Sequence, residues 1–179
     1  NLGNFLRSQY NCLLTTSKTI NNDNPLLDCR IESLEKKSPT LIILDRYFKI
    51  KKNLKILKNK NRKIYIFTTI MNRSKANFFK KKGVKIIKMN SEDVKPQKIF
   101  YKIKKLGLNR VFVEAGSSFL YQLLKLSLVK NLFLFKSSKK LFSDGKNNSS
   151  ISYIKKIKTS QENKVKVNLY GDNLYKVKL

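Results

Sequence analysis

Residues Arg110–Phe135 read RVFVEAGSSFLYQLLKLSLVKNLFLF, and this stretch decides the fold class. RVFV is a short β-branched and aromatic run, which is typical of a buried strand. SSFLYQLLKLSL has apolar residues at helical spacing, so we expect a helix with Ser117 or Ser118 as its N-cap. NLFLFK predicts a second strand. A strand, a helix and a strand in series indicate an α/β protein with a largely parallel sheet.

The same alternation extends outward from this stretch. CLLTT, TLIILD, KIYIFTT and VKIIKM read as further strands, and NFLRSQY, NRSKANFFKKKG and KPQKIFYKIKKLG as helices. Residues 163–179 alternate apolar and polar side chains and turn at Gly171–Asp172, which predicts a β-hairpin. Residues 137–150 form one long polar loop. We therefore expect a single domain: a mixed, mostly parallel sheet with helices on both faces and a C-terminal β-hairpin.

The charge of the chain allows two interpretations. The 40 basic and 11 acidic residues give a net charge of +29, which is the composition of a nucleic-acid-binding protein. However, 34 of the basic residues are lysines and only six are arginines, and they are dispersed without an aromatic-basic motif. Specific nucleic-acid binding favours arginine, so a general lysine enrichment is the better interpretation. A positive field would still attract a phosphorylated ligand.

Several classes of site are excluded by residues that the chain lacks. It has no histidine, so it has no Ser-His-Asp machinery and no histidine metal site. It contains neither GxGxxG nor GxxxxGK[ST], so the standard dinucleotide fingerprint and the P-loop are absent. Cys12 and Cys29 lie in or beside apolar runs and are expected to be buried free thiols in a reducing cytosol. We see no signal peptide and no apolar run long enough to span a membrane, and expect a cytoplasmic protein.

Three polar segments follow predicted strands, at the end of the sheet where ligands bind in α/β proteins. These are TTSKTINNDNP, DRYFK and EAGSS. We expect the first to be a polar loop, in which Asp23 either serves a site or simply caps the turn at Asn24–Pro25. In the third, Glu114 ends a strand and Gly116 precedes a helix N-terminus, an arrangement that suits an anion. Glu114 could equally be a loop hydrogen-bonding residue.

Two ordered segments closely resemble the C-terminal reductase domain of the bifunctional riboflavin biosynthesis deaminase/reductase, whose fold is dihydrofolate-reductase-like. LRSQYNCLLTTSKTINNDNPLLDCR (residues 6–30) is similar to the family pattern of a helical arginine, a strand, a threonine, an acid-acid-proline turn, a leucine and an arginine. RVFVEAGSSFLYQLLKLSLVKNLFLF is similar to its second signature, a strand ending in Glu-(Gly/Ala)-Gly, a helix and a strand. TLIILD matches the strand between them.

The resemblance implies NADPH-dependent reduction of 5-amino-6-(5-phosphoribosylamino)uracil, in which the ribose ring opens and C1′ receives a hydride. It implies substrate contacts from Arg7, Leu27, Arg30 and Glu114, the arginines suiting a ribose phosphate. Asp23 or Glu114 would be the catalytic group that handles the proton. It also implies cofactor contacts from Thr19, Asp23, Arg46, Gly116, Ser117, Ser118, Phe119, Leu120, Tyr121 and Gln122. A homodimer is implied, and no metal.

The chain departs from the family pattern at several places. Asn24 replaces the second acid of the turn, Lys130–Asn131 replace an acidic pair, and Arg46 stands where the family usually carries a serine. The family's first strand, with its lysine and Ser-Leu-Asp-Gly motif, and the N-terminal deaminase domain have no counterpart, so we expect this chain alone to be an inactive fragment. The alternative function is a lysine-rich protein that binds nucleic acid or associates with the ribosome.

Overall fold

The computed structural model describes residues 2–59, 62–137, 149–167, 169 and 171–179. The chain divides into two compact units, Asn1–Gly116 and Ser117–Leu179, and each is described by itself. Of the predicted long loop, residues 138–148 lie outside the described residues. Its last two residues begin helix α6, Ser149–Lys155, rather than ending the loop.

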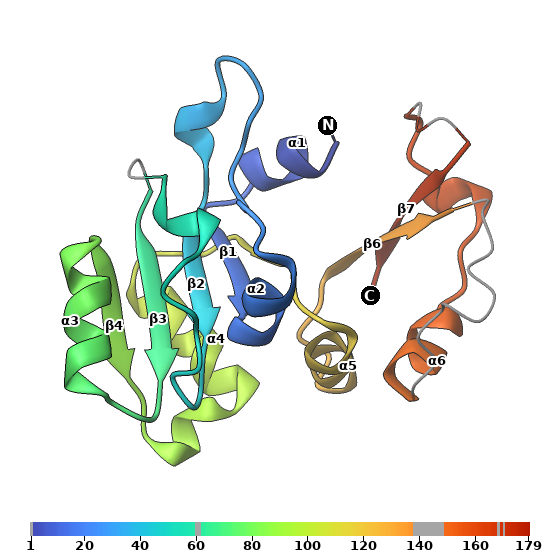
Figure 1. Cartoon of the computed structure of the whole chain (residues 1–179). Coiled ribbons are helices and arrows are strands. Elements are labelled where there is room, and N and C mark those ends of the chain that lie inside the picture. Colours follow the sequence, from blue (N-terminus) through green and yellow to red (C-terminus); the bar gives the residue numbers. More distant parts are fainter. Residues whose placement is uncertain (1, 60–61, 138–148, 168, 170) are drawn as a thin grey trace. The chain divides into compact units, whose positions relative to one another are not determined.

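The first unit is built on a parallel five-stranded sheet with the order β4-β3-β2-β1-β5 (Figure 1). Its strands are β1 (Cys12–Thr16), β2 (Thr40–Leu44), β3 (Ile64–Thr68), β4 (Val84–Lys88) and β5 (Val111–Val113). Its helices are α1 (Leu2–Ser8), α2 (Ser17–Asp23), α3 (Arg73–Lys81) and α4 (Pro96–Lys105), with 3-10 turns at Glu35–Lys37, Lys55–Leu57 and Ser91–Val94. Every strand predicted for this unit is present, which confirms the α/β assignment.

Alternation along the strands covers both faces of this sheet. Leu13, Leu41, Ile43 and Ile66 point to one face, where they form one buried cluster that includes Ile20 of α2 and Ala76 and Phe79 of α3. Their neighbours on the strands point to the other face, and Figure 1 shows α4 behind the strands, with Ile99 and Ile103 buried. Helices therefore lie on both faces, as predicted.

Helix α2 corrects the expectation of a polar loop after β1. Ser17–Asp23 is helical, although its residues SKTINND are mostly poor helix formers. The Thr16 hydroxyl accepts a hydrogen bond from the backbone N–H of Thr19 as the N-cap, Ile20 is fully buried, and Asn24 ends the helix in the left-handed conformation at φ 42°. Capping and the burial of one isoleucine thus outweigh local propensity.

The second unit contains α5 (Ser117–Lys125), β6 (Asn131–Lys136), α6, a 3-10 turn at Gln161–Asn163 and β7 (Asn173–Lys178). Strands β6 and β7 pair antiparallel along six residues and form a sheet of their own. Lys164 bridges Tyr175 and Gly171 has a φ of +98°, so the chain does turn back before β7 as predicted. Helix α5 begins at Ser117, so Ser117 and Ser118 are its first two helical residues and not its N-cap.

Candidate active site

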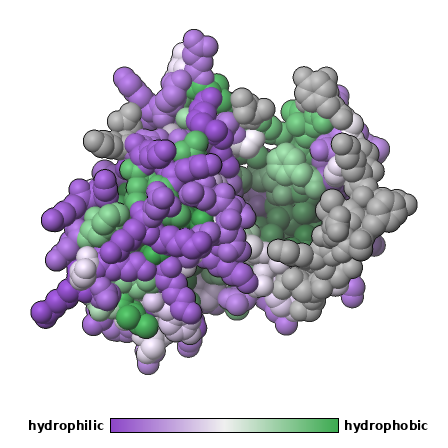
Figure 2. Space-filling model, viewed as in Figure 1, coloured by the Kyte–Doolittle hydropathy of each residue, from purple (hydrophilic) through white to green (hydrophobic). Residues whose placement is uncertain are grey.

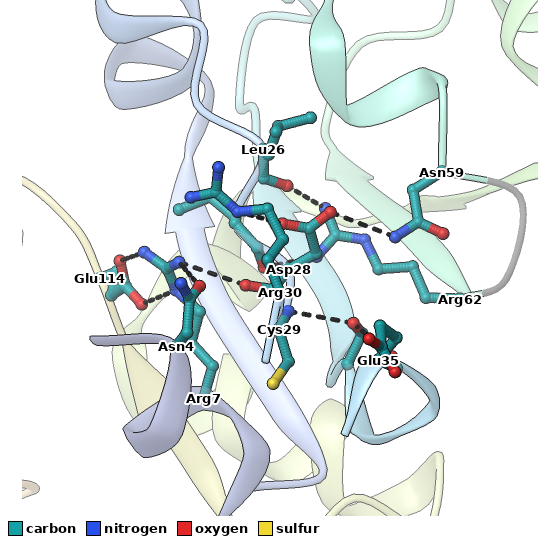
Figure 3. Close-up of polar contacts among 12 residues, drawn as sticks. Asn4, Arg7, Leu26, Asp28, Cys29, Arg30, Glu35, Asn59, Arg62 and Glu114 are labelled. Carbon is teal, nitrogen blue, oxygen red and sulfur yellow. Dashed lines mark hydrogen bonds and ion pairs between the residues drawn. The ribbon is translucent and has the colours of Figure 1, made fainter. Parts of the chain in front are cut away.

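Arg7 and Glu114 form a bidentate ion pair in the first unit (Figure 3). Arg7 lies in the last turn of α1, and Glu114 follows β5 directly. The Nε and Nη2 atoms of Arg7 donate to the two carboxylate oxygens of Glu114 at 2.7 and 2.9 Å. These hydrogen bonds raise the pKa of Arg7, against the opposing effect of burial. The pair joins two residues that are 107 positions apart in the sequence.

The remaining terminal nitrogen of Arg7 is also engaged. Its Nη1 atom donates to the side-chain oxygen of Asn4 at 3.1 Å and to the backbone carbonyl of Asp28 at 3.2 Å. Asn4 is buried on the same helix. The Arg7 guanidinium is therefore held from three sides, and it connects Glu114 to the segment that follows α2.

Asp28 is the centre of a second set of contacts beside this pair (Figure 3). Its residue is 7% exposed. Its Oδ2 atom accepts a hydrogen bond from the Asn59 side chain at 3.3 Å, and its Oδ1 atom lies 3.3 Å from Nε of Arg30 in an ion pair. The side chain of Arg30 is 57% exposed, so this arginine bridges the buried carboxylate and the solvent.

Arg62 anchors the backbone on which Asp28 lies. Its Nη1 atom donates to the carbonyl of Leu27 at 2.5 Å and its Nη2 atom to the carbonyl of Leu26 at 2.7 Å. Burial lowers the pKa of Arg62 to about 10, although the nearby Asp28 carboxylate raises it. At neutral pH the guanidinium is thus still charged. We refer to Arg7, Asp28, Arg30, Arg62 and Glu114 as the arginine cluster.

The arginine cluster contains most of the unsatisfied buried polar atoms that the described residues show. Among all the described residues, three buried side-chain atoms lack a hydrogen bond: Oδ1 of Asp28 and Nε of Arg62, both in the cluster, and Oγ1 of Thr15, which lies outside it. Buried polar atoms are usually satisfied, because leaving one unpaired costs free energy. Two such atoms around one carboxylate distinguish this region from an ordinary structural network.

A cavity of about 1010 Å³ borders the cluster at the amino ends of β3 and β4. Arg62 and Asn59 belong to both the cavity and the contacts around Asp28. The cavity is lined by Lys52, Asn53, Leu54, Leu57, Lys58, Asn59, Arg62, Ile64, Phe78, Lys81, Lys82 and Gly83. This lining carries five cations and no carboxylate. Hydrophilic residues also cover most of the visible face of the first unit (Figure 2).

The structure brings three of the predicted substrate residues together, namely Arg7, Arg30 and Glu114. The fourth, Leu27, lies between them in sequence but contributes its backbone rather than its side chain. Its side chain is 4% exposed and belongs to the hydrophobic core, whereas its carbonyl accepts from Arg62. Leu27 has a φ of +56°, a strained conformation for a leucine, so this backbone is fixed by its surroundings.

The predicted cofactor residues of the first unit lie on α2 and after β2. Asp23 is the exposed last residue of α2. The Thr19 hydroxyl lies 3.0 Å from that of Thr16, within the helix cap. Arg46 follows β2 with its guanidinium over the Tyr47 ring at 5.9 Å, and its carbonyl accepts from the backbone N–H and the hydroxyl of Thr69.

The remaining cofactor residues flank the division between the two units. Gly116 is exposed, and a Cβ atom added there would meet no atom within 4 Å. Ser117, Ser118, Phe119, Leu120, Tyr121 and Gln122 form the first six residues of α5.

Sequence reasoning missed Asn4, Asp28, Asn59 and Arg62. A signal was available for two of them, because the chain contains only eleven acids and six arginines. Three of the six arginines and two of the acids meet in the arginine cluster.

Among the described residues, no group of three or more Cys, Asp or Glu side chains is placed to hold a metal ion. In the same part of the chain, no helix has the length and apolar character needed to cross a membrane.

Comparison with known proteins gives consistent similarities. Residues 3–167 match the family described as RibD C-terminal domain. The chain is 30% identical over 154 residues to the 5-amino-6-(5-phosphoribosylamino)uracil reductase of Buchnera aphidicola, an alignment that covers 78% of this chain and 72% of that protein.

Two solved structures share the fold. The riboflavin biosynthesis reductase Rib7 of Saccharomyces cerevisiae superposes with a TM-score of 0.71 at 22% identity, over 99% of this chain and 78% of that one. The diaminohydroxyphosphoribosylaminopyrimidine deaminase/5-amino-6-(5-phosphoribosylamino)uracil reductase of Thermotoga maritima gives 0.66 at 20% identity, over 98% of this chain. The chain spans 47% of the length of that protein, about half.

Proposed function

Because the chain belongs to the RibD C-terminal domain family, we propose that it is a 5-amino-6-(5-phosphoribosylamino)uracil reductase of riboflavin biosynthesis. The reaction would open the ribosyl ring and reduce C1′ with NADPH to give the ribityl product. The observation that carries the proposal is the ion pair between Arg7 and Glu114. It joins the two sequence segments that resemble the reductase family, and it places a carboxylate and three arginines in one region.

The arginines supply the means to hold a phosphorylated substrate. Arg30 exposes more than half of its side chain, and an arginine can bind a phosphate monoester through two parallel hydrogen bonds. The positive charge of Arg7 and Arg62 adds to the attraction of a dianion. We assign the ribose phosphate to Arg30, and the part of the substrate near C1′ to Glu114 and Arg7.

Ring opening requires a group that moves a proton at the ring oxygen, and two carboxylates are candidates. Glu114 accepts two hydrogen bonds from Arg7, so its orientation is fixed. Asp23 is exposed at the end of α2 and is free to meet a ligand from solvent. We assign the proton to Glu114 because a positioned general acid or base is the more effective one, and we keep Asp23 as a cofactor contact.

NADPH, when bound, supplies the hydride. The chain's own residues would hold it through Thr19, Asp23 and Arg46 in the first unit, and through Gly116 and the beginning of α5. The exposed Arg46 guanidinium suits the 2′-phosphate that distinguishes NADPH from NADH. The protein would act in the cytoplasm. It would form a homodimer, and light scattering of the purified protein would test this oligomeric state.

The proposal is tested by NADPH oxidation with the pyrimidine substrate and by mass spectrometry of the product. We expect a product that has gained two hydrogens, formed by a protein that contains this chain and by its Arg73→Lys control. Arg73 is an exposed residue at the start of α3, away from the arginine cluster. If a folded protein that contains this chain neither oxidises NADPH nor forms the ribityl product, the proposed function is wrong.

A further inference from the structure

We propose that Asp28 and Arg62 are positioning residues. They orient the side chain of Arg30 toward a phosphate monoester, and they thereby make the arginine cluster selective for this group. This inference rests on the proposed function for the identity of the substrate. Asp28 lies within the first family-like segment but is none of its pattern residues, and Arg62 lies outside both segments.

The Asp28 carboxylate orients the side chain of Arg30. Its Nε atom faces the Asp28 carboxylate at 3.3 Å, and Figure 3 shows its terminal nitrogens directed away from Asp28. An arginine held at Nε presents its two terminal nitrogens as a pair, which matches two oxygens of a phosphate. Without the carboxylate, this exposed side chain would lose its fixed orientation.

Asp28 itself requires stabilising contacts, because burying a carboxylate without partners costs free energy. The Asn59 side chain donates a hydrogen bond to the Asp28 carboxylate, and the charge of Arg62 stabilises this carboxylate from the cavity side. Its Oδ1 atom accepts no hydrogen bond from the part of the chain that the structure describes. That oxygen is therefore available to Arg30, and the ion pair can shorten when Arg30 binds an anion.

Arg62 holds the backbone that leads to Asp28. Its two hydrogen bonds hold the carbonyls of Leu26 and Leu27, directly before Asp28. They fix the backbone where Leu27 adopts a φ of +56°. The same backbone gives the carbonyl of Asp28 to Arg7. Arg62 thus sets the position of Arg30 through Asp28 and that of Arg7 through the backbone, although it contacts neither ligand group itself.

The test uses ribose 5-phosphate and ribose as probes, with dissociation constants measured by calorimetry. We expect Asp28→Asn and Arg62→Lys each to weaken ribose 5-phosphate about tenfold, the loss of about one charged hydrogen bond. Ribose binding should not change. Arg62→Lys keeps the charge but cannot reach both carbonyls, and Arg73→Lys, the same exchange at an exposed site, should change neither constant.

A double-variant cycle separates positioning from a merely structural role. If Asp28 acts through Arg30, Asp28→Asn combined with Arg30→Ala should bind ribose 5-phosphate no more weakly than Arg30→Ala alone. Additive losses would overturn the proposal, as would folded Asp28→Asn and Arg62→Lys proteins that bind the phosphate within twofold of wild type. If Asp28→Asn does not fold, Arg62→Lys decides alone. Selective binding of ribose 5-phosphate by a protein that turns over no pyrimidine would support this inference while contradicting the proposed reaction.

Discussion

Asp45 and Asp28 are both buried carboxylates of the first unit. The two differ in the hydrogen bonds that their surroundings donate to them. Asp45, directly after β2, is 2% exposed and accepts three hydrogen bonds: from the Ser17 hydroxyl at 2.8 Å, and from the backbone N–H groups of Lys49 and Ile50 at 2.9 and 2.7 Å. Among the described residues, Asp28 accepts one hydrogen bond, at 3.3 Å, and its Oδ1 atom accepts none.

We interpret this difference as one between a carboxylate that holds the fold and a carboxylate that serves the proposed site. A carboxylate whose oxygens accept short hydrogen bonds from backbone N–H groups fixes a loop and has little capacity left for a ligand. A carboxylate that faces one exposed and one buried arginine is arranged around charge instead. We therefore expect substitutions in the Asp45 region to change stability, and substitutions in the arginine cluster to change binding and turnover.

The largest expected effect belongs to Glu114, on the functional side of this comparison. Glu114→Gln keeps the shape of the side chain but removes the charge that meets Arg7 and the proposed proton transfer. Turnover should fall by about a hundredfold or more, the usual contribution of a positioned acid or base. Steady-state NADPH oxidation measures it, with circular dichroism as the control for folding. Near-normal turnover in a folded variant would remove Glu114 from the reaction.

A matched pair of substitutions tests the comparison directly. Asp45→Asn would turn an amide N–H towards a backbone N–H that now donates to the carboxylate, and should lower the free energy of unfolding by about 3 kcal/mol. Asp28→Asn should lower it by only about 1 kcal/mol, because one long hydrogen bond and a half-exposed ion pair are affected. Urea unfolding of both variants gives the two values. Equal losses would break the comparison.

Arg30→Ala should raise the KM for the pyrimidine substrate, since a charged hydrogen bond to phosphate contributes about 1.5–3 kcal/mol. The KM for NADPH should stay within twofold, because the substitution affects the substrate phosphate only. Initial rates at low ionic strength measure both constants, so that salt does not mask the charge. A change in the KM for NADPH, with an unchanged KM for the pyrimidine substrate, would mean that Arg30 faces the cofactor.

The fold was largely predictable because its strands are short apolar runs. CLLTT, TLIILD and KIYIFTT became three neighbouring strands, since such runs can be buried only inside a sheet. Helix α2 was not predictable from local sequence, because SKTINND has one apolar residue and its helix depends on capping by Thr16 and on the core around Ile20. The packing around Ile20 is a tertiary contact that the local sequence does not show.

The site was predictable only where a motif carried it. Arg7, Arg30 and Glu114 were found by resemblance, and the structure brings them together. Asp28 and Arg62 are 34 positions apart and meet only because the chain folds back before β3, so no local pattern could pair them. Local sequence also did not show where Leu27 lies. Its motif position indicated a ligand contact, but its side chain lies in the core.

Cys12 supplies a buried ionisable group that lies in neither region. Burial raises the pKa of its thiol to about 12, from an ordinary value of 9.0. Between pH 9 and 12 the folded chain keeps a proton that the unfolded chain releases, so the stability should fall as the pH rises through this range. Cys12→Ala should make that fall shallower by about 1 kcal/mol per pH unit. An unchanged slope in urea unfolding at pH 9 to 10.5 would contradict it.

The smallest expected effect concerns Arg46, which the Asp45 region presents to solvent. Asp45 fixes the loop after β2, and the Arg46 carbonyl is held by Thr68 and Thr69, so the backbone is rigid while the guanidinium stays exposed. If this guanidinium meets the 2′-phosphate, Arg46→Ser should narrow the preference for NADPH over NADH about threefold, the modest value of an exposed charge pair. Arg73→Ser, at another exposed arginine, should leave the preference unchanged. The ratio of kcat/KM for the two cofactors is the measurement, and raising the ionic strength should shrink the difference between wild type and Arg46→Ser. An identical ratio in both proteins at low salt would leave Arg46 as a solvated loop residue, and the Asp45 region would then serve the fold alone.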